Sequence, residues 1–112
     1  MARQINRSVH PAVVELREML QREMGDKFVR LYHFGSRVEG GADPESDYDL
    51  VCITTVPLDS AEKDRLMERQ LDIQMDHYLL FDLHYYCQEQ LRTGITSFSP
   101  FIQHVKENGV LV

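Results

Sequence analysis

The segment from His33 to Leu50, HFGSRVEGGADPESDYDL, constrains this chain more than any other part of its sequence. Gly35-Ser36 ends one apolar stretch, and two alternate aspartates, Asp47 and Asp49, open the next. Alternate residues of a strand point to the same face about 6.6 Å apart, so we expect the two carboxylates to point together. Carboxylates in this arrangement can share divalent cations such as Mg²⁺. The segment therefore predicts a site for metal ions and phosphate groups.

Gly35-Ser36 supplies the phosphate-binding half of this predicted site. Glycine lets a phosphate approach the backbone closely. A serine that opens a short helix adds its hydroxyl and the free N–H groups of a helix N-terminus. An EF-hand calcium loop does not explain the segment, because the sixth loop position, counted from position 43, 45 or 47, is never a glycine.

The spacing of these motifs resembles a known superfamily. Gly35-Ser36, ten intervening residues and Asp47-Tyr48-Asp49 are similar to the signature of the nucleotidyltransferases related to DNA polymerase beta, in particular their minimal nucleotidyltransferase (MNT) branch. The resemblance extends to Arg37–Gly40, to Ser46–Leu50 and to the C-terminal SPFIQHVKENGVLV. It also includes a third aspartate on a later strand, best matched by Asp82 in LLFDLHYY.

The resemblance implies an activity and a set of site residues. The catalytic and metal-binding carboxylates would be Asp47, Asp49 and Asp82. The nucleotide-binding residues would be Gly35, Ser36 and Arg37. Two Mg²⁺ ions would be the cofactor, and ATP or another nucleoside triphosphate would be the donor. Asp82 would complete the metal site and help to deprotonate the hydroxyl that attacks the nucleotide.

The acceptor hydroxyl is not specified by these motifs, because nothing in the chain forms a dedicated acceptor domain. Stand-alone MNT proteins commonly resemble antitoxins encoded beside HEPN-type ribonucleases, and some transfer AMP from ATP to a tyrosine of the toxin. The resemblance therefore implies a HEPN-type partner protein. Two alternatives stay open: a catalytically inactive MNT-fold binding module, and a small-molecule nucleotidyltransferase of the antibiotic-modifying kind.

Asp82 is assigned on an additional physical ground. An aspartate between two apolar residues of a strand is costly to bury unless it is paired or bound to metal. Asp72 and Asp76 compete for the third carboxylate position, but they fall within a helical pattern, where acids usually face solvent. His84 shares its strand alternation with Asp82, so it either lines the site or serves the structure. His33 stands where relatives usually have an aliphatic residue.

The hydrophobic pattern predicts a single domain over residues 1–112, with an α+β (α/β sandwich-like) nucleotidyltransferase fold in which helices pack on a small mixed sheet. We expect a helix capped by Ser8 that ends near Gly25, and a long helix capped by Asp59 or Ser60 with Met67, Leu71, Met75 and Tyr78 on one face. We expect strands over 28–34, 48–54, 79–86 and 110–112, and a last helix from Ser99-Pro100 to Asn108-Gly109.

Composition narrows the class of partner. The net charge of −6 and the scattered basic residues disfavour non-specific nucleic-acid binding. No 18-residue apolar run and no N-terminal signal core occur, so we expect a cytoplasmic protein without a membrane segment.

Strand alternation predicts that Cys52 and Cys87 face away from the carboxylates. The apolar C-terminal segment predicts either an interface or closure of the core.

Overall fold

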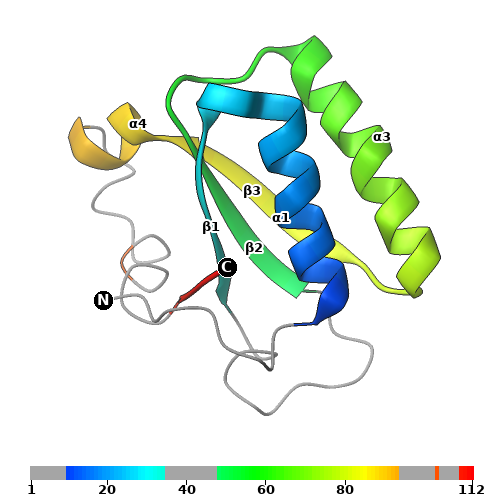
Figure 1. The fold of residues 1–112 in the computed structure, drawn as a ribbon. Helices are drawn as coiled ribbons and strands as arrows, with labels where there is room; N and C mark the ends of the chain where they lie inside the picture. Colours follow the sequence, from blue (N-terminus) through cyan, green and yellow to red (C-terminus); the bar gives the residue numbers. More distant parts are fainter. Residues whose placement is uncertain (1–9, 35–47, 94–102, 104–108) are drawn as a thin grey trace.

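The computed structural model of this chain describes residues 10–34, 48–93, 103 and 109–112 (Figure 1). The elements are α1 (Pro11–Met24), the 3₁₀ helix η1 (Gly25–Lys27), β1 (Phe28–Phe34), β2 (Tyr48–Thr54), α3 (Ser60–His77), β3 (Phe81–Cys87), α4 (Gln88–Thr93) and β4 (Val110–Leu111). Within the described residues the strands form one sheet in the order β3-β2-β1-β4. β2 and β3 are parallel, and the other neighbouring strands are antiparallel.

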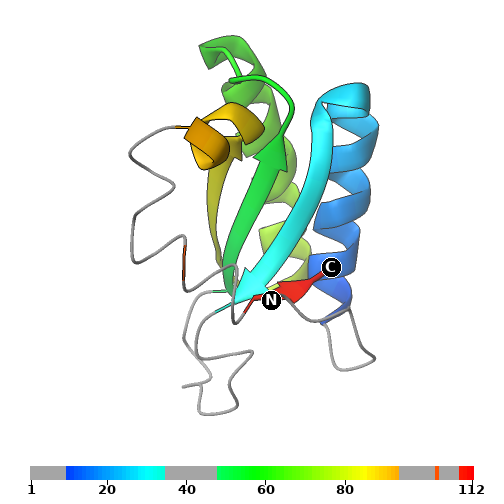
Figure 2. The ribbon, with the colours of Figure 1, turned by 90° about the vertical axis from the view of Figure 1, so that its left-hand side faces the viewer.

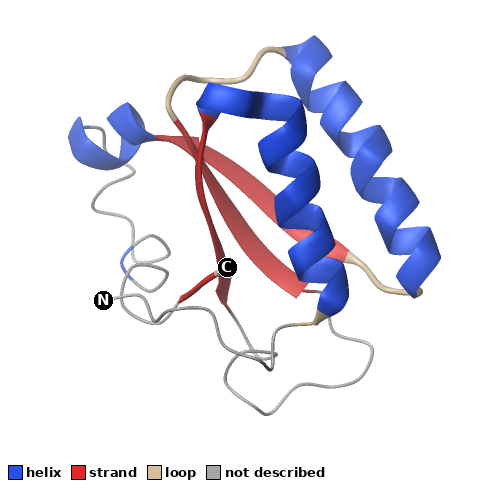
Figure 3. Ribbon diagram, in the orientation of Figure 1, coloured by secondary structure: helices blue, strands red, loops and turns tan. Residues whose placement is uncertain are grey.

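Helices α1 and α3 cover the same face of this mixed sheet (Figures 1, 2 and 3). The main core lies between these helices and the sheet. Its most deeply buried side chains are Ala12, Val13, Leu16, Met19, Leu20, Leu31, Leu50, Cys52 and Leu66. A smaller cluster of Phe34, Val51 and Ile53 lies on the opposite face, where Leu91 of α4 packs against it. The predicted α+β fold with helices on a small mixed sheet is confirmed.

Strand β2 supplies side chains to both of these clusters. Tyr48, Leu50 and Cys52 pack on the helix-covered face, whereas Val51 and Ile53 belong to the opposite cluster. Burial on both faces explains why this stretch is an almost unbroken apolar run, with bounds that agree with the predicted 48–54. Strand β1 has the predicted bounds as well.

Only the C-terminal end of α1 agrees with the end predicted from the sequence. The predicted cap Ser8 lies outside the described residues, and His10 occupies the cap position: its Nδ1 accepts a hydrogen bond from the Ala12 N–H at 3.0 Å. A neutral imidazole nitrogen can therefore replace the usual serine oxygen at this place. At the other end Gly25 has a φ of 55°, a conformation that glycine adopts without a Cβ clash.

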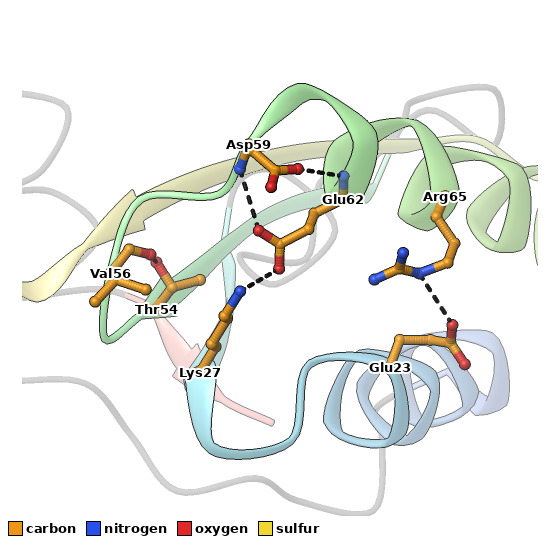
Figure 4. A network of polar contacts seen from close by, with 7 residues as sticks. All are labelled: Glu23, Lys27, Thr54, Val56, Asp59, Glu62 and Arg65. Carbon is orange, nitrogen blue, oxygen red and sulfur yellow. Dashed lines mark hydrogen bonds and ion pairs between the residues drawn. The ribbon is translucent and has the colours of Figure 1, made fainter.

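The start of α3 is fixed by a capping box and by an ion pair to η1 (Figure 4). Asp59 Oδ1 accepts from the Glu62 N–H at 2.8 Å, and the Asp59 N–H donates to Glu62 Oε1 at 3.2 Å. Glu62 Oε2 accepts from Lys27 Nζ. This hydrogen bond is the largest cause that holds the pKa of Glu62 below its ordinary value. Arg65 adds a second link, to Glu23 of α1 at 3.6 Å.

The apolar row that the sequence places on one face of α3 is not the buried row of this helix. Met67, Leu71, Met75 and Tyr78 share one side of the helix as expected, but their side chains are exposed. The buried residues are Leu66, Gln70, Ile73 and Gln74. One row along α3 is apolar and exposed, whereas the other combines two apolar residues with two glutamines. Docking onto α1 and β3 buries the second row. Periodicity alone cannot make that choice.

The C-terminal residues close the core rather than extend from it. The predicted terminal strand is confirmed as β4, which pairs with β1. The Val112 N–H donates to the Leu31 carbonyl at 2.9 Å, and the Val112 carbonyl accepts from Arg17 Nε at 2.8 Å. The helix predicted from Ser99 lies outside the described residues except for Gln103. In the part of the chain that is described, no helix has the length and apolar character needed to cross a membrane.

Strand β3 also ends differently from its predicted range of 79–86. It covers Phe81–Cys87 and runs directly into α4, a short helix that the sequence pattern did not predict. The Gln90 side chain accepts from the Cys87 N–H at 3.0 Å, so a side chain satisfies the backbone where the strand becomes a helix.

Replacing Glu62 by Gln tests the ion pair that fixes the start of α3. Because the folded-state pKa of Glu62 lies below its ordinary value of 4.5, the ionised form stabilises the fold above that pH. This stabilisation is lost as the pH falls through the lowered pKa. We expect Glu62→Gln to lower the free energy of unfolding near neutral pH, with a deficit that shrinks in acid.

Urea unfolding curves at a series of pH values measure this deficit. Glu68→Gln is the matched control, because Glu68 is an exposed acid of the same helix and lies outside the capping box. A Glu62→Gln deficit that stays constant at every pH would contradict the assignment to the carboxylate charge.

Candidate functional site

The parallel pairing of β2 and β3 brings two of the predicted carboxylates together. Asp49 is the direct register partner of Asp82. Neighbouring strands lie about 4.8 Å apart, and paired residues of parallel strands point to the same face. Asp49 shares its face with Val51 and Ile53, which is the face opposite to α1 and α3. The two aspartates therefore lie side by side on the side of the sheet that these helices leave uncovered.

The end of β1 adjoins the same place. Phe34 is the antiparallel partner of Asp49, so the sheet carries Phe34, Asp49 and Asp82 across three neighbouring strands. Gly35, Ser36 and Arg37 follow Phe34 in the chain, and they lie outside the described residues, as does Asp47. Their predicted roles stay predictions.

The Asp82 carboxylate is exposed. This differs from the expectation, based on its apolar neighbours in the strand, that the carboxylate is buried and costly unless paired or bound to metal. Its side chain is 52% exposed, because the strand pleat turns it away from Phe81, which faces the helices. Asp82 Oδ1 lies 3.2 Å from His84 Nε2, and the His84 side chain is 45% exposed. His84 therefore lies on the same face as Asp82. This position is the one required for the first of its two predicted roles, that of lining the site. This contact orients the Asp82 carboxylate.

The donor atoms present fit a hard divalent cation. In the described part of the chain, no three His, Cys, Asp or Glu side chains gather closely enough to hold a metal ion by themselves. Asp49 and Asp82 offer two carboxylates. Mg²⁺ prefers one or two protein carboxylates completed by waters and substrate phosphates. The pair therefore matches the chemistry of a magnesium site that needs a phosphate-bearing substrate for its remaining ligands.

The competing acids Asp72 and Asp76 do not join this site. Both are exposed on α3, where they line a hollow with Glu15, Glu18 and Arg22 of α1. Helices α1 and α3 lie on the face of the sheet opposite to Asp49. The sheet therefore separates these acids from the Asp49–Asp82 pair.

His33 also belongs to the helix-covered face. It is 5% exposed, and its ring stacks on Tyr48 with centroids 5.5 Å apart and planes 29° from parallel. The Tyr48 ring in turn meets the edges of His10 and Phe81 at 5.5 and 6.4 Å. His33 therefore packs in an aromatic cluster, which explains why a flat ring can stand where relatives usually have an aliphatic residue.

The two cysteines face away from the carboxylates, as predicted. Cys52 is fully buried in the helix-covered core, and burial raises the pKa of its thiol to about 12. A thiol in this environment stays protonated and is a poor nucleophile. Cys87 is buried as well. Burial also raises the pKa of Tyr85, which lies on the same side of β3.

Two buried glutamines of α3 position the start of β3, and sequence reasoning missed them. Gln74 Oε1 accepts from the Phe81 N–H at 3.0 Å, and Gln70 Nε2 donates to the Phe81 carbonyl at 3.3 Å. The two side chains are joined by a third hydrogen bond of 3.0 Å. They satisfy backbone groups at the edge of the sheet, one residue before Asp82. The signal in the sequence was a pair of glutamines at i and i+4, Gln70 and Gln74, on the same side of the helix as the apolar Leu66 and Ile73.

Comparison with known proteins agrees with this geometry. The sequence model described as "Nucleotidyltransferase domain" matches residues 13–110. The chain belongs to this nucleotidyltransferase family. Spectinomycin 9-adenylyltransferase of Enterococcus faecalis is 27% identical over 67 residues, which cover 60% of this chain and 26% of that protein. The chain therefore spans about a quarter of the length of this curated relative.

Solved structures show the same nucleotidyltransferase fold. The spectinomycin adenyltransferase AAD(9) from Enterococcus, solved with ATP and spectinomycin, superposes with a TM-score of 0.67 at 19% identity, over 89% of this chain and 47% of that chain. A toxin-antitoxin with AMP-PNP gives 0.58 at 22% identity, over 89% and 68%. A mutant of the MntA-HpeT toxin-antitoxin gives 0.61 at 19% identity, over 88% and 69%.

Replacing Gln74 by Met tests the link between α3 and the site. Met has a similar length but cannot accept a hydrogen bond from the Phe81 N–H, which becomes unsatisfied and buried. We expect a loss of about 1–3 kcal/mol in the free energy of unfolding, measured with urea. Gln88→Met is the matched control because Gln88 is exposed, and we expect it to change stability by less than about 0.5 kcal/mol. Equal losses in both variants would contradict the positioning role.

Proposed function

We propose that this chain is a metal-dependent nucleotidyltransferase that transfers AMP from ATP to a hydroxyl acceptor. The observation that carries the proposal is the register pairing of Asp49 with Asp82, beside the end of β1 from which Gly35 and Ser36 follow. Membership of the nucleotidyltransferase family supports it. So do the nucleotides ATP and AMP-PNP in the structures of two proteins with the same fold.

Each predicted residue has a role in this proposal. The backbone at Gly35 and the hydroxyl of Ser36 bind the β- and γ-phosphates, and Arg37 adds a positive charge beside them. Asp47, Asp49 and Asp82 would hold two Mg²⁺ ions, which neutralise phosphate charge and stabilise the attacking and leaving oxygens when bound. An oxygen of Asp82 accepts the proton of the attacking hydroxyl, and His84 holds that carboxylate in place. Most of the rate enhancement then comes from positioning.

The acceptor in this proposal is a tyrosine of a HEPN-type toxin, for which the chain acts as the antitoxin. The support is the shared fold with two toxin-antitoxin structures, each matched over more than two thirds of its chain. A tyrosine on a mobile segment of a partner could reach the face of Asp49 and Asp82, which α1 and α3 leave uncovered.

A second candidate is transfer to a small molecule. The sequence match to spectinomycin 9-adenylyltransferase favours it. An inactive binding module is the third reading, and the presence of all the signature residues argues against it. These three candidates differ in the product that they form: an adenylylated protein, an adenylylated small molecule, or none.

Incubation with ATP and Mg²⁺ separates them. The chain is incubated with the product of its neighbouring gene and, separately, with spectinomycin, and the products are analysed by intact-mass spectrometry. We expect the partner protein to gain one or more AMP units. Adenylylated spectinomycin would instead support the second candidate. A stable complex with no added mass would support the binding module.

Substitution of the carboxylates tests the site itself. Asp47→Asn, Asp49→Asn and Asp82→Asn each remove a charge that metal binding requires, and we expect each to lower the transfer rate by about 100-fold or more, since a bound metal ion contributes several kcal/mol. Asp72→Asn is the matched control on the opposite face. Undiminished transfer by Asp49→Asn, in protein with an unchanged melting temperature, would overturn the site assignment.

A further inference from the structure

Exposed apolar side chains gather on one part of the molecule. The described residues contain six large hydrophobic side chains that are exposed, and five of them lie on α3 or just after it. We call this set the α3 outer surface: Met67, Leu71, Met75, Tyr78 and Leu80. Met67, Leu71 and Met75 follow one another at i, i+4 and i+8, so they form a continuous row along about two turns of the helix. An exposed row of this kind marks a contact surface.

The C-terminal end of this row opens into a hollow. Gln74, Met75, Tyr78, Leu79 and Leu80 line an open, mostly apolar depression of about 400 Å³. A leucine or aromatic side chain of a partner would fit into such a depression. Methionine is unbranched and flexible, so Met67 and Met75 can adapt their shape to an incoming side chain.

Tyr78 is unusual in its backbone and in its exposure. It ends α3 with φ 54° and ψ 48°, the left-handed conformation in which glycine or asparagine is usual. Its side chain is 96% exposed, so it does not offset the backbone strain by packing within the protein. The exposed phenol is therefore open to contact at the C-terminal end of the row.

A row of acids runs beside the apolar row. Asp64, Glu68, Asp72 and Asp76 recur at every fourth position, and all four side chains are exposed. None of them forms an ion pair with a residue in the described part of the chain. Glu68, Asp72 and Asp76 each lie one residue after a member of the apolar row, Met67, Leu71 or Met75. The acids therefore line one long edge of the apolar row with negative charge.

We propose that the α3 outer surface binds an amphipathic helix of a partner protein, with lysines and arginines flanking its apolar side. The apolar row and the hollow take the apolar side of that helix, and the acidic row pairs with its basic flank. A second copy of this chain fits less well, because the net charge of −6 and the acidic rows of two copies repel each other.

This surface is separate from the candidate nucleotide site. Helix α3 lies on one face of the sheet, and the Asp49–Asp82 pair lies on the other. A helix bound to the α3 outer surface therefore leaves that pair accessible. The proposal holds whether or not the chain transfers a nucleotide.

Methionine methyl resonances give a direct test. The chain contains five methionines: Met67 and Met75 lie in the α3 outer surface, whereas Met19 and Met24 are buried residues of α1. The ¹³C-methyl-methionine protein is titrated with a helical peptide of about 18 residues that has leucines at i, i+3, i+4 and i+7 and lysines on both flanks. We expect the resonances of Met67 and Met75 to shift and those of Met19 and Met24 to stay unchanged.

Two controls make the test specific. A peptide with glutamates in place of the lysines carries the same apolar side and should bind at least about tenfold more weakly. The lysine peptide should bind more tightly at low salt than at high salt, because salt screens its attraction to the acidic row. Leu71→Glu should weaken binding of the lysine peptide by about tenfold or more. Val56→Glu is the matched variant, since Val56 and Leu71 are both 46% exposed and only Leu71 belongs to the surface. Val56→Glu should bind like the unaltered protein.

Several outcomes would overturn the proposal. Equal binding of the two peptides, or no shift of Met67 and Met75, excludes a basic amphipathic helix as the occupant. A dimer in sedimentation experiments that Leu71→Glu dissociates would assign the surface to a second copy of the chain. Equal effects of Leu71→Glu and Val56→Glu would show that the peptide binds by charge alone.

Discussion

The candidate site depends on the parallel pairing of β2 with β3. Parallel strands need a crossover connection, and α3 supplies it between Thr54 and Phe81. The register places Asp49 beside Asp82. A slip of one residue would turn Asp82 onto the helix-covered face and separate the carboxylates. Gln70 and Gln74 each form one hydrogen bond to Phe81, the first residue of β3, and a third hydrogen bond joins the two glutamines. The packing of α3 therefore helps to fix the register of β3.

The two faces of the sheet have different tasks. The helix-covered face holds most of the core, including the buried Cys52 and the stacked pair of His33 and Tyr48. The opposite face carries Asp49 and Asp82 beside a smaller apolar cluster. The strand pleat permits this division, because consecutive residues point to opposite sides. An acid in an apolar strand is therefore not costly when its own face is accessible, which is why Asp82 needs no buried partner.

Helix α3 carries three different surfaces along one sequence. Leu66, Ile73 and the two glutamines are buried, and the acids Asp64, Glu68, Asp72 and Asp76 face solvent. The row of Met67, Leu71 and Met75 lies between them and is exposed. Periodicity identified the apolar row and placed it on one face of the helix. Docking through glutamine hydrogen bonds buried a different row, and a sequence pattern contains no information about those bonds.

The sequence by itself determined the local elements. Apolar runs bounded by turn residues gave β1 and β2 their observed limits, and Asp59 with Glu62 three residues later marked the start of α3. The alternation of Asp47 and Asp49 and the motif beginning at Gly35 indicated the family. Only the tertiary structure decided that Asp82 lies beside Asp49 and that the row at Leu71 is exposed. Those outcomes depend on contacts between residues far apart in the chain, whereas caps, turns and strand alternation depend on neighbours within a few positions.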